Sequence, residues 1–327
     1  MDPHYTIFGS PRSLFTRKLE AAMQFYNAPY SIEKKRDDNR EIIEKRAGTR
    51  QIPVLKTPEN WMLADTTPVL MLLDSRFIQR RLFPTGPLGV LVHIVEEVLD
   101  EWVARVMVHY RWHHDMNTRV VISEILDREV SIREARKTTL AQWGLRACRA
   151  TGTENPTQQA AAEREYIDML STLNNQLSDT AYSLGSRPCA VDAALIGGLR
   201  GHTNRDPLPN LSEFSHVLEW NGHSPTYSEC DGEWADFPNS TPFADHILKL
   251  ARTEYKPFIL GNQTALANGE KTFVADTYGE PVRYLCRPYP ERSRRMVARR
   301  ISNLTPNERR QVAEWLEGKG LRECFSV

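Results

Sequence analysis

The first 80 residues combine short β-rich runs with helical spacing of apolar residues. A β-rich run over residues 5–8 stops at Gly9-Ser10-Pro11, and apolar residues then recur at helical spacing from Phe15 to Tyr26. Further strands are predicted at 29–32, at 53–56 and near 61–62. Further helices are predicted at 34–46, which is highly charged, and at 68–77. The order of these elements, βαβαββα, predicts an α/β domain over residues 1–80.

A Pro- and Gly-containing segment at 81–87 predicts a linker, and the pattern beyond it is helical. An apolar face that starts at Leu91 and an opposite face that includes Glu96 and Glu97 predict a long amphipathic helix reaching Met116. Further helices are predicted at 121–149 and around 166–177. We therefore expect an all-helical domain over residues 88–220.

The remaining residues, 221–327, form an extension with its own elements. In chain order, the pattern predicts a helix starting at Phe243, a hairpin of 272–275 and 282–285, and a helix from a capping box at Thr305 to Gly318 or Gly320. Residues 287–300 contain six arginines, and we interpret them as a solvated helix face because the whole chain is neutral. The extension is expected to pack on the helical domain.

Composition narrows the possible function classes. The chain has 42 basic and 42 acidic residues, so no net charge attracts nucleic acid or a membrane surface. Its five cysteines are scattered without a CxxC pair, and the sequence shows neither a signal peptide nor a long apolar segment. We therefore expect a cytoplasmic protein with reduced thiols and with no nucleic-acid or membrane partner.

The run Gln51-Ile52-Pro53-Val54-Leu55, followed by Asp65-Thr66, carries the strongest functional signal. Proline cannot donate to a sheet ladder, so Pro53 predicts a strand that begins at a turn or lies at an edge, where a cis X-Pro bond is compatible. Such a turn exposes the backbone of Ile52 to an extended ligand, while Asp65 can accept from an ammonium and Thr66 can donate to a carboxylate. The alternative is an ordinary strand entry followed by an ordinary helix cap.

This pattern resembles the glutathione site of the cytosolic glutathione S-transferases, in which a Lys or Gln, a β-branched residue and Pro-Val-Leu precede Glu-Ser by about ten residues. The resemblance extends over residues 4–205 and includes 184–195, where Cys189 replaces the usual capping Ser and Asp192 is kept. It implies a thioredoxin-like N-terminal domain, an all-α C-terminal domain and a homodimer. The glutathione-binding residues that it implies are Gln51, Ile52, Pro53, Asp65 and Thr66.

In this family the catalytic residue lies in the loop after the first strand. Here that loop has no Tyr or Cys, and its hydroxyls are Ser10 and Ser13. We favour Ser13, four residues before Arg17, because this spacing resembles the serine-type classes, and we keep Ser10 as the second candidate. The hydroxyl would donate to the glutathione sulfur and, with the following helix N-terminus, favour the thiolate. The alternative for Ser13 is a plain helix cap.

The resemblance places the second substrate against the helical domain. We predict that Tyr110, Arg111 and Trp112 line that pocket, with interhelical packing as the alternative. His109 and His113 are one helical turn apart, but no carboxylate or cysteine completes a ligand set in the sequence, so we predict no metal site.

Together these features predict a glutathione-dependent transferase, with glutathione as cosubstrate, that attacks a small hydrophobic or aromatic electrophile in detoxification. The extension would narrow the substrate pocket or support the dimer. Two alternatives stay open: a glutathione-dependent etherase or lyase, and a non-catalytic scaffold that keeps the fold.

Overall fold

The N-terminal part of the chain forms a four-stranded sheet with helices, as the sequence predicts. The computed structural model describes residues 4–222 and 232–326. The N-terminal elements are β1 Tyr5–Phe8, α1 Leu14–Phe25, β2 Tyr30–Glu33, α2 Arg40–Ala47, β3 Val54–Lys56, β4 Met62–Ala64 and α3 Thr66–Arg76. The strand order is β2-β1-β3-β4, with β1 parallel to β2 and β3 antiparallel to both of its neighbours. The predicted βαβαββα order is confirmed.

Helix α2 is shorter than the predicted helix over 34–46. The Arg36 backbone N–H donates to Asn39 Oδ1 at 2.8 Å, so a local turn precedes the helix. Asn favours such turns because its side chain competes with helical hydrogen bonds. Helix α2 therefore begins at Arg40.

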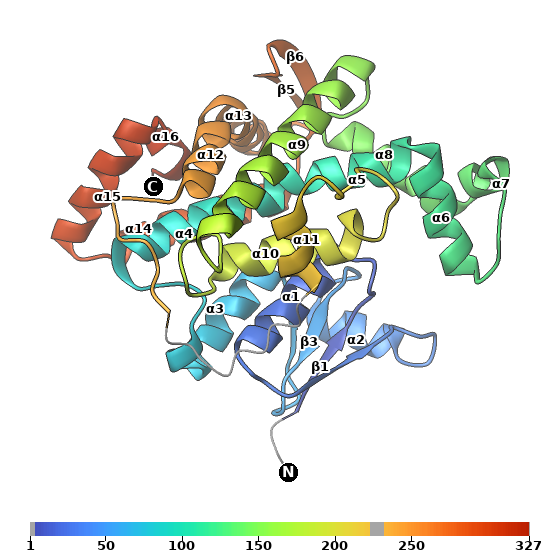
Figure 1. The fold of residues 1–327 in the computed structure, drawn as a ribbon, viewed down its shortest axis with the longest axis horizontal. Coiled ribbons are helices and arrows are strands. Elements are labelled where there is room, and N and C mark those ends of the chain that lie inside the picture. Colours follow the sequence, from blue (N-terminus) through green and yellow to red (C-terminus); the bar gives the residue numbers. More distant parts are fainter. Residues whose placement is uncertain (1–3, 223–231, 327) are drawn as a thin grey trace.

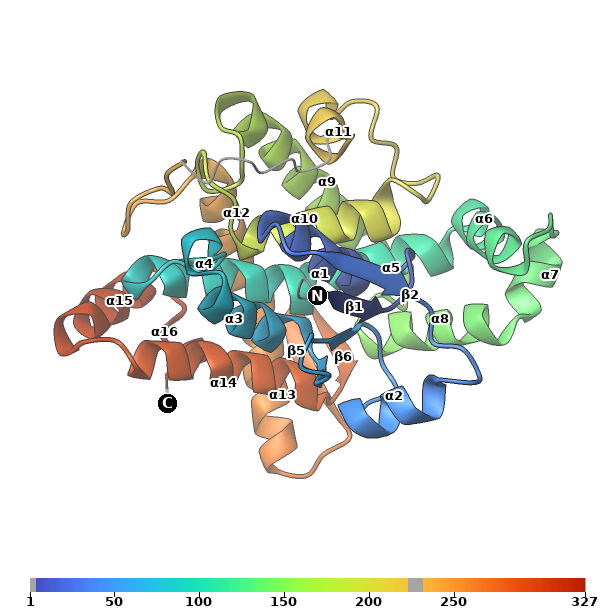
Figure 2. The ribbon, with the colours of Figure 1, turned by 90° about the horizontal axis from the view of Figure 1, so that it is seen from below.

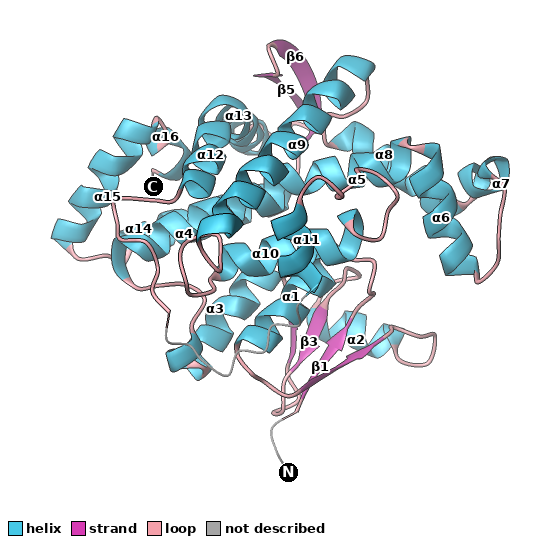
Figure 3. Ribbon diagram, in the orientation of Figure 1, coloured by secondary structure: helices cyan, strands magenta, loops and turns pink. Residues whose placement is uncertain are grey.

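The chain then becomes helical (Figures 1 and 3). After a 3₁₀ turn at Ile78–Arg80, the elements are α4 Gly86–Val98, a π-helical turn Leu99–Val103, α5 Ala104–His113, α6 Asp115–Leu126, α7 Ile132–Lys137, α8 Thr139–Ala150, α9 Pro156–Asp179, α10 Ala190–Gly198, a π-helical turn Leu199–Thr203 and α11 Ser215–Gly222. The stretch predicted as one helix at 121–149 is thus divided among α6, α7 and α8. At the start of α10, Asp192 accepts from the Cys189 N–H and thiol, so Cys189 acts there as a donor.

The extension supplies further helices and the predicted hairpin. Its elements are α12 Pro242–Leu250, a π-helical turn Ala251–Tyr255, α13 Lys256–Ala267, β5 Thr272–Thr277, β6 Glu280–Leu285, α14 Pro288–Ser302, α15 Pro306–Lys319 and α16 Arg322–Phe325. The predicted capping box at Thr305 is present, and α15 ends at Lys319 with Gly320 as its C-cap, whose φ of 71° suits glycine.

Helix α4 packs between α10 and the extension, so the acidic face of this amphipathic helix lies against protein. It packs against α10 and against α12, α14 and α15 of the extension, as Figure 2 shows for α14. Glu96 and Glu97 are therefore both fully buried. One continuous apolar core joins residues of all three regions, such as Leu70, Val95 and Val297. Among the helices of the described residues, none is both long and apolar enough to cross a membrane.

The arginine-rich helix α14 is less solvated than predicted. Arg294 is buried and bonded to Glu291 and to the Cys324 carbonyl oxygen. Arg300 lies over the Phe83 ring at 4.7 Å and donates to His93 Nδ1. These arginines hold the extension in place because their charges and stems point into protein contacts.

Candidate functional site

The strand register brings three sequence segments to one end of the sheet. Phe8 at the end of β1 pairs with Val54 at the start of β3, and Val54 pairs with Ala64 at the end of β4. The chain leaves or enters the sheet directly beyond these residues. The loop with Ser10 and Ser13, the turn of residues 51–53 and the pair at 65–66 therefore lie at the same end. The N-termini of α1 and α3 lie there too, and both favour negative charge.

The turn before β3 has the geometry that its proline predicts. The Ile52–Pro53 peptide bond is cis, and Pro53 is buried while Ile52 is partly exposed. The Gln51 side chain is exposed. Lys35 Nζ donates to the carbonyl oxygens of Gln51 at 2.7 Å and Arg50 at 3.2 Å, an anchor that the sequence analysis missed.

Asp65 is not an ordinary helix cap. It precedes α3 with a φ of 73°, which an L-residue other than Asn or Asp rarely adopts, and its side chain makes no capping hydrogen bond. The simple cap alternative for Asp65 is therefore wrong. Burial raises the pKa of its carboxyl group, while the charge of Lys18 opposes this rise and that of Glu96 adds to it. Backbone strain of this kind concentrates at functional positions. Thr66 is the buried first residue of α3.

Both candidate serines already take part in local turns. Ser13 is the N-cap of α1, and its Oγ accepts from the Thr16 N–H at 3.3 Å. Ser10 Oγ accepts from the Arg12 N–H, also at 3.3 Å. Accepting a hydrogen bond leaves the hydroxyl proton free to be donated elsewhere. Capping and donation to a sulfur are thus compatible roles for Ser13.

A buried group of charges lies behind Asp65, and sequence reasoning missed it. Lys18 of α1 is fully buried and bonded to Glu96 and Asp100, and to Thr67 at 3.3 Å. Burial raises the pKa of Asp100 to about 7, although Lys18 acts in the opposite direction. Glu96 Oε2 and Asp100 Oδ1 have no hydrogen-bond partner. With both carboxylates ionised, this group carries one net negative charge, which would favour a cationic ligand group nearby.

The three residues that were predicted to line the second-substrate pocket, Tyr110, Arg111 and Trp112, differ in their surroundings. Arg111 is buried and donates to Asp206 at 2.8 and 3.0 Å, to the Gly201 carbonyl at 2.7 Å and to the Arg12 carbonyl at 2.8 Å. Trp112 is buried in a separate small cluster between α5 and its neighbours. These contacts favour the packing alternative for both residues. The Tyr110 ring is buried and lies 5.3 Å from the His114 ring.

Two cavities occur near these elements. The first is lined by α1, α5, α9 and α10 residues that include Leu14, Met107 and Tyr166, and its volume of about 20 Å³ suits about one water molecule. The second, of about 650 Å³, is lined by Met71 of α3, by linker residues 81 and 83–86, and by α14 residues that include Arg300. The lining of this larger cavity does not include the predicted glutathione residues.

Comparison with known proteins defines the class of the N-terminal domain. Residues 7–81 match the family described as Glutathione S-transferase, N-terminal domain. The fold is thus a thioredoxin-like domain of glutathione S-transferase type, with a mixed sheet, followed by a largely helical part.

Solved structures that resemble the chain include glutathione S-transferases and a β-etherase. One is from Rhodospirillum rubrum F11, with 12% identity, a TM-score of 0.45, and coverage of 74% of this chain and 99% of that chain. Another, from Methylobacillus flagellatus KT with glutathione bound, has 14% identity, a TM-score of 0.43, and coverage of 66% and 92%. The β-etherase LigF from Sphingobium sp. strain SYK-6 has 14% identity, a TM-score of 0.45, and coverage of 69% and 97%.

Proposed function

We propose that the protein is a serine-type, glutathione-dependent transferase. The observation that carries this proposal is the register of β1, β3 and β4, which gathers the three predicted glutathione segments at one end of the sheet. A match of residues 7–81 to the glutathione S-transferase N-terminal domain supports it. The proposal includes the homodimer and the cytoplasmic location that the sequence analysis predicts.

In this proposal the glutathione backbone pairs with the backbone of Ile52 beside the cis-Pro53 turn, and Gln51 lies at the edge of the glutathione site. Asp65 accepts from the γ-glutamyl ammonium, which its buried acidic surroundings favour, and Thr66 donates to the adjacent carboxylate. Partial burial raises the pKa of the Asp65 carboxyl group, and an ammonium partner would favour its ionised form.

Ser13 would donate its hydroxyl proton to the glutathione sulfur at the N-terminus of α1. Both the hydrogen bond and the helix dipole stabilise the thiolate over the thiol, so the thiol proton is released to water. The thiolate then forms a carbon–sulfur bond with the electrophile as the leaving group departs with its electron pair. Ser10 is the second candidate for the donor.

The thiolate step can be measured directly by ultraviolet absorbance of bound glutathione across a pH series. We expect Ser13→Ala to raise the pKa of the bound thiol by about one unit, because a neutral hydrogen bond contributes about 1 kcal/mol. Ser13→Thr keeps a hydroxyl and a helix cap, so it should retain most of the thiolate.

Ser10→Ala is the matched control for this experiment. If Ser10→Ala raises the thiol pKa and Ser13→Ala does not, Ser10 is the donor. If neither substitution changes the thiol pKa, the hydroxyl mechanism is wrong.

A non-catalytic scaffold is the second candidate, and one observation favours it. Of the two cavities described above, the one beside Leu14 holds about one water molecule, and the larger one is not lined by the predicted glutathione residues. Glutathione binding without turnover over a broad panel of electrophiles would support this second candidate.

A further inference from the structure

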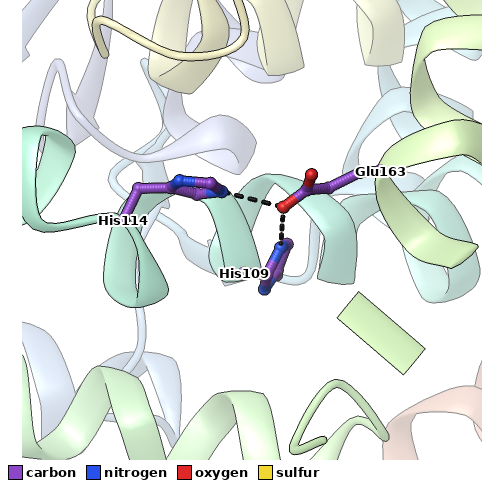
Figure 4. Close-up of side chains that lie close together, drawn as sticks. All are labelled: His109, His114 and Glu163. Atoms are coloured by element: carbon purple, nitrogen blue, oxygen red, sulfur yellow. Dashed lines mark hydrogen bonds and ion pairs between the residues drawn. The ribbon is translucent and has the colours of Figure 1, made fainter. Parts of the chain in front are cut away.

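Two side chains at the end of α5 and one from α9 converge on one point. His109 is on α5, His114 follows α5 directly, and Glu163 is on α9. The Nε2 atoms of His109 and His114 each lie 2.8 Å from Glu163 Oε1. Figure 4 shows both imidazoles pointing at this one carboxylate oxygen. Over residues 4–222 and 232–326, this is the one group of three or more His, Cys, Asp or Glu whose ligand atoms lie within 4.8 Å of one another.

This group supplies the carboxylate that the sequence alone does not place beside the histidines. Glu163 lies 54 residues after His109 and reaches it only because α9 packs against α5. The true partner of His109 in the group is His114 rather than His113, since His114 shares the same carboxylate oxygen. The sequence analysis weighed His109 with His113 and placed no carboxylate beside them, whereas the structure brings Glu163 to His109 and His114.

The spacing is close to that of a tetrahedral metal site. With metal–nitrogen and metal–oxygen bonds of about 2.0–2.2 Å, neighbouring ligand atoms lie about 3.3 Å apart. The observed nitrogen–oxygen separations of 2.8 Å must therefore open by about half an ångström. The side chains of His114 and Glu163 are 30% and 33% exposed, so both can move, whereas that of His109 is 1% exposed and fixed.

A fourth residue orients the buried ligand. His113 Nδ1 lies 2.7 Å from His109 Nδ1. An imidazole that binds a metal through Nε2 carries its proton on Nδ1 and donates it to a neighbouring acceptor. His113 is placed to be that acceptor, so it fixes the tautomer in which the His109 Nε2 lone pair faces the group.

The local charges are compatible with a bound cation. Arg136 and Arg105, which lie near the group, each have a carboxylate of their own: Arg136 lies 2.6 Å from Asp115, and Arg105 lies 3.3 Å from Glu165. Glu163 therefore interacts with the imidazoles of His109 and His114. Two imidazoles and one carboxylate suit borderline cations such as Zn²⁺, whereas Ca²⁺ and Mg²⁺ prefer oxygen ligands alone.

We propose that His109, His114 and Glu163 bind one borderline divalent cation of the Zn²⁺ class, with His113 as the hydrogen-bond partner of His109. The partly exposed side of the site leaves the fourth position to water. The ion would join α5 to α9 in the helical region. This site does not depend on glutathione, so its test is separate from that of the proposed transferase.

The first experiment is calorimetric titration of the chelator-treated, dialysed full chain with ZnCl₂ in a buffer that does not coordinate metals. We expect saturable binding of about one ion per chain, weakened about tenfold or more by Glu163→Gln and by His114→Ala. His216→Ala, at an exposed histidine of α11, is the matched control and should bind as the unmodified chain does. Equal affinity in all four proteins, or no saturable binding, would overturn the proposal.

Two further measurements guard against effects on folding and against binding by cysteines. Zn²⁺ should raise the melting temperature of the unmodified chain and of His216→Ala but not that of Glu163→Gln. Co²⁺ bound to the unmodified chain should give the visible absorption of a tetrahedral nitrogen and oxygen site, without the near-ultraviolet band of a thiolate ligand. A thiolate band would assign the ion to cysteine and contradict the site.

Discussion

At the residue scale, Asp65 shows how a sequence motif becomes a site. The motif predicts that Asp65, which precedes α3, binds a ligand, but an acidic residue at this position is also a common helix cap. The structure argues against the helix cap, because Asp65 has a φ of 73° and its side chain makes no capping hydrogen bond. Ser13 does cap its helix, so its part in catalysis stays a prediction. Local sequence patterns predict that Asp65 and Ser13 each precede a helix. They cannot predict which of the two side chains makes the capping hydrogen bond.

The buried His202 should make the free energy of unfolding depend on pH. Burial and the nearby Arg111 lower the pKa of His202 well below its ordinary value, and Arg111 Nη1 donates to the neutral Nε2. The unfolded chain binds a proton at this residue below about pH 6.5, whereas the folded chain does not. Protonation therefore favours unfolding, and the contribution of His202 to stability falls as the pH falls.

The measurement is urea unfolding of the unmodified chain and of His202→Gln between about pH 7.5 and 4.5, a range around the ordinary histidine pKa. Glutamine can accept from Arg111 and donate to the Met107 carbonyl oxygen, as the neutral His202 does, but it does not titrate. The unmodified chain should lose more free energy of unfolding than the variant as the pH falls. Parallel pH profiles would contradict a neutral buried His202.

At the element scale, the position of α4 explains where sequence reasoning succeeds and fails. Helical spacing predicts this helix, with acidic residues on the face opposite its apolar one. In the structure α1 and α3 cover one side of those positions and the extension covers the other. Burial of this face depends on contacts of Lys18 with residues 78 and 82 positions later, which local periodicity cannot show. The available signal was Lys18 itself, a cation on the apolar face of α1.

The Lys18 cluster should contribute strongly to stability. Lys18→Met leaves the buried Glu96 and Asp100 without their cation, so we expect a loss of about 3–5 kcal/mol in the free energy of unfolding. The triple variant Lys18→Met, Glu96→Gln, Asp100→Asn removes the charges together and should recover much of that loss. Denaturant unfolding measures both variants.

The exposed Lys45 of α2 offers the control for this prediction. Lys45→Met should change the free energy of unfolding by less than about 0.5 kcal/mol. A Lys18→Met variant as stable as Lys45→Met would show that the buried ion pairs contribute little.

At the scale of the whole molecule, the extension is part of the core rather than an appendage. Its helices α12, α14 and α15 pack against α4, and Tyr255 and Ser293 bond to the buried Glu97. The sequence predicted most of its elements, including the hairpin and the final helix, because turns and caps are local signals. It could not predict which helix they cover, since that depends on packing between residues far apart in the chain.

Removal of residues 223–327 should therefore abolish cooperative folding. The truncated chain would expose the apolar and acidic side of α4 that α14 and α15 cover, and we expect it to be insoluble or to lack a cooperative thermal transition. Solubility and calorimetric melting of the truncated chain test this. A soluble fragment with a sharp transition would instead assign residues 1–222 to an independent folding unit.

The three segments gathered at one end of the sheet are proposed to form a glutathione site. Calorimetric titration with glutathione, on the unmodified chain and on Asp65→Asn and Asp65→Gly, tests it most directly. Asn tolerates the positive φ without the charge, and Gly removes any strain there, so the pair separates charge from backbone effects.

We predict saturable binding to the unmodified chain and about 10- to 100-fold weaker binding to both variants, because each loses a charge-assisted hydrogen bond. No saturable binding to the unmodified chain, or equal affinity in all three proteins, would contradict the account.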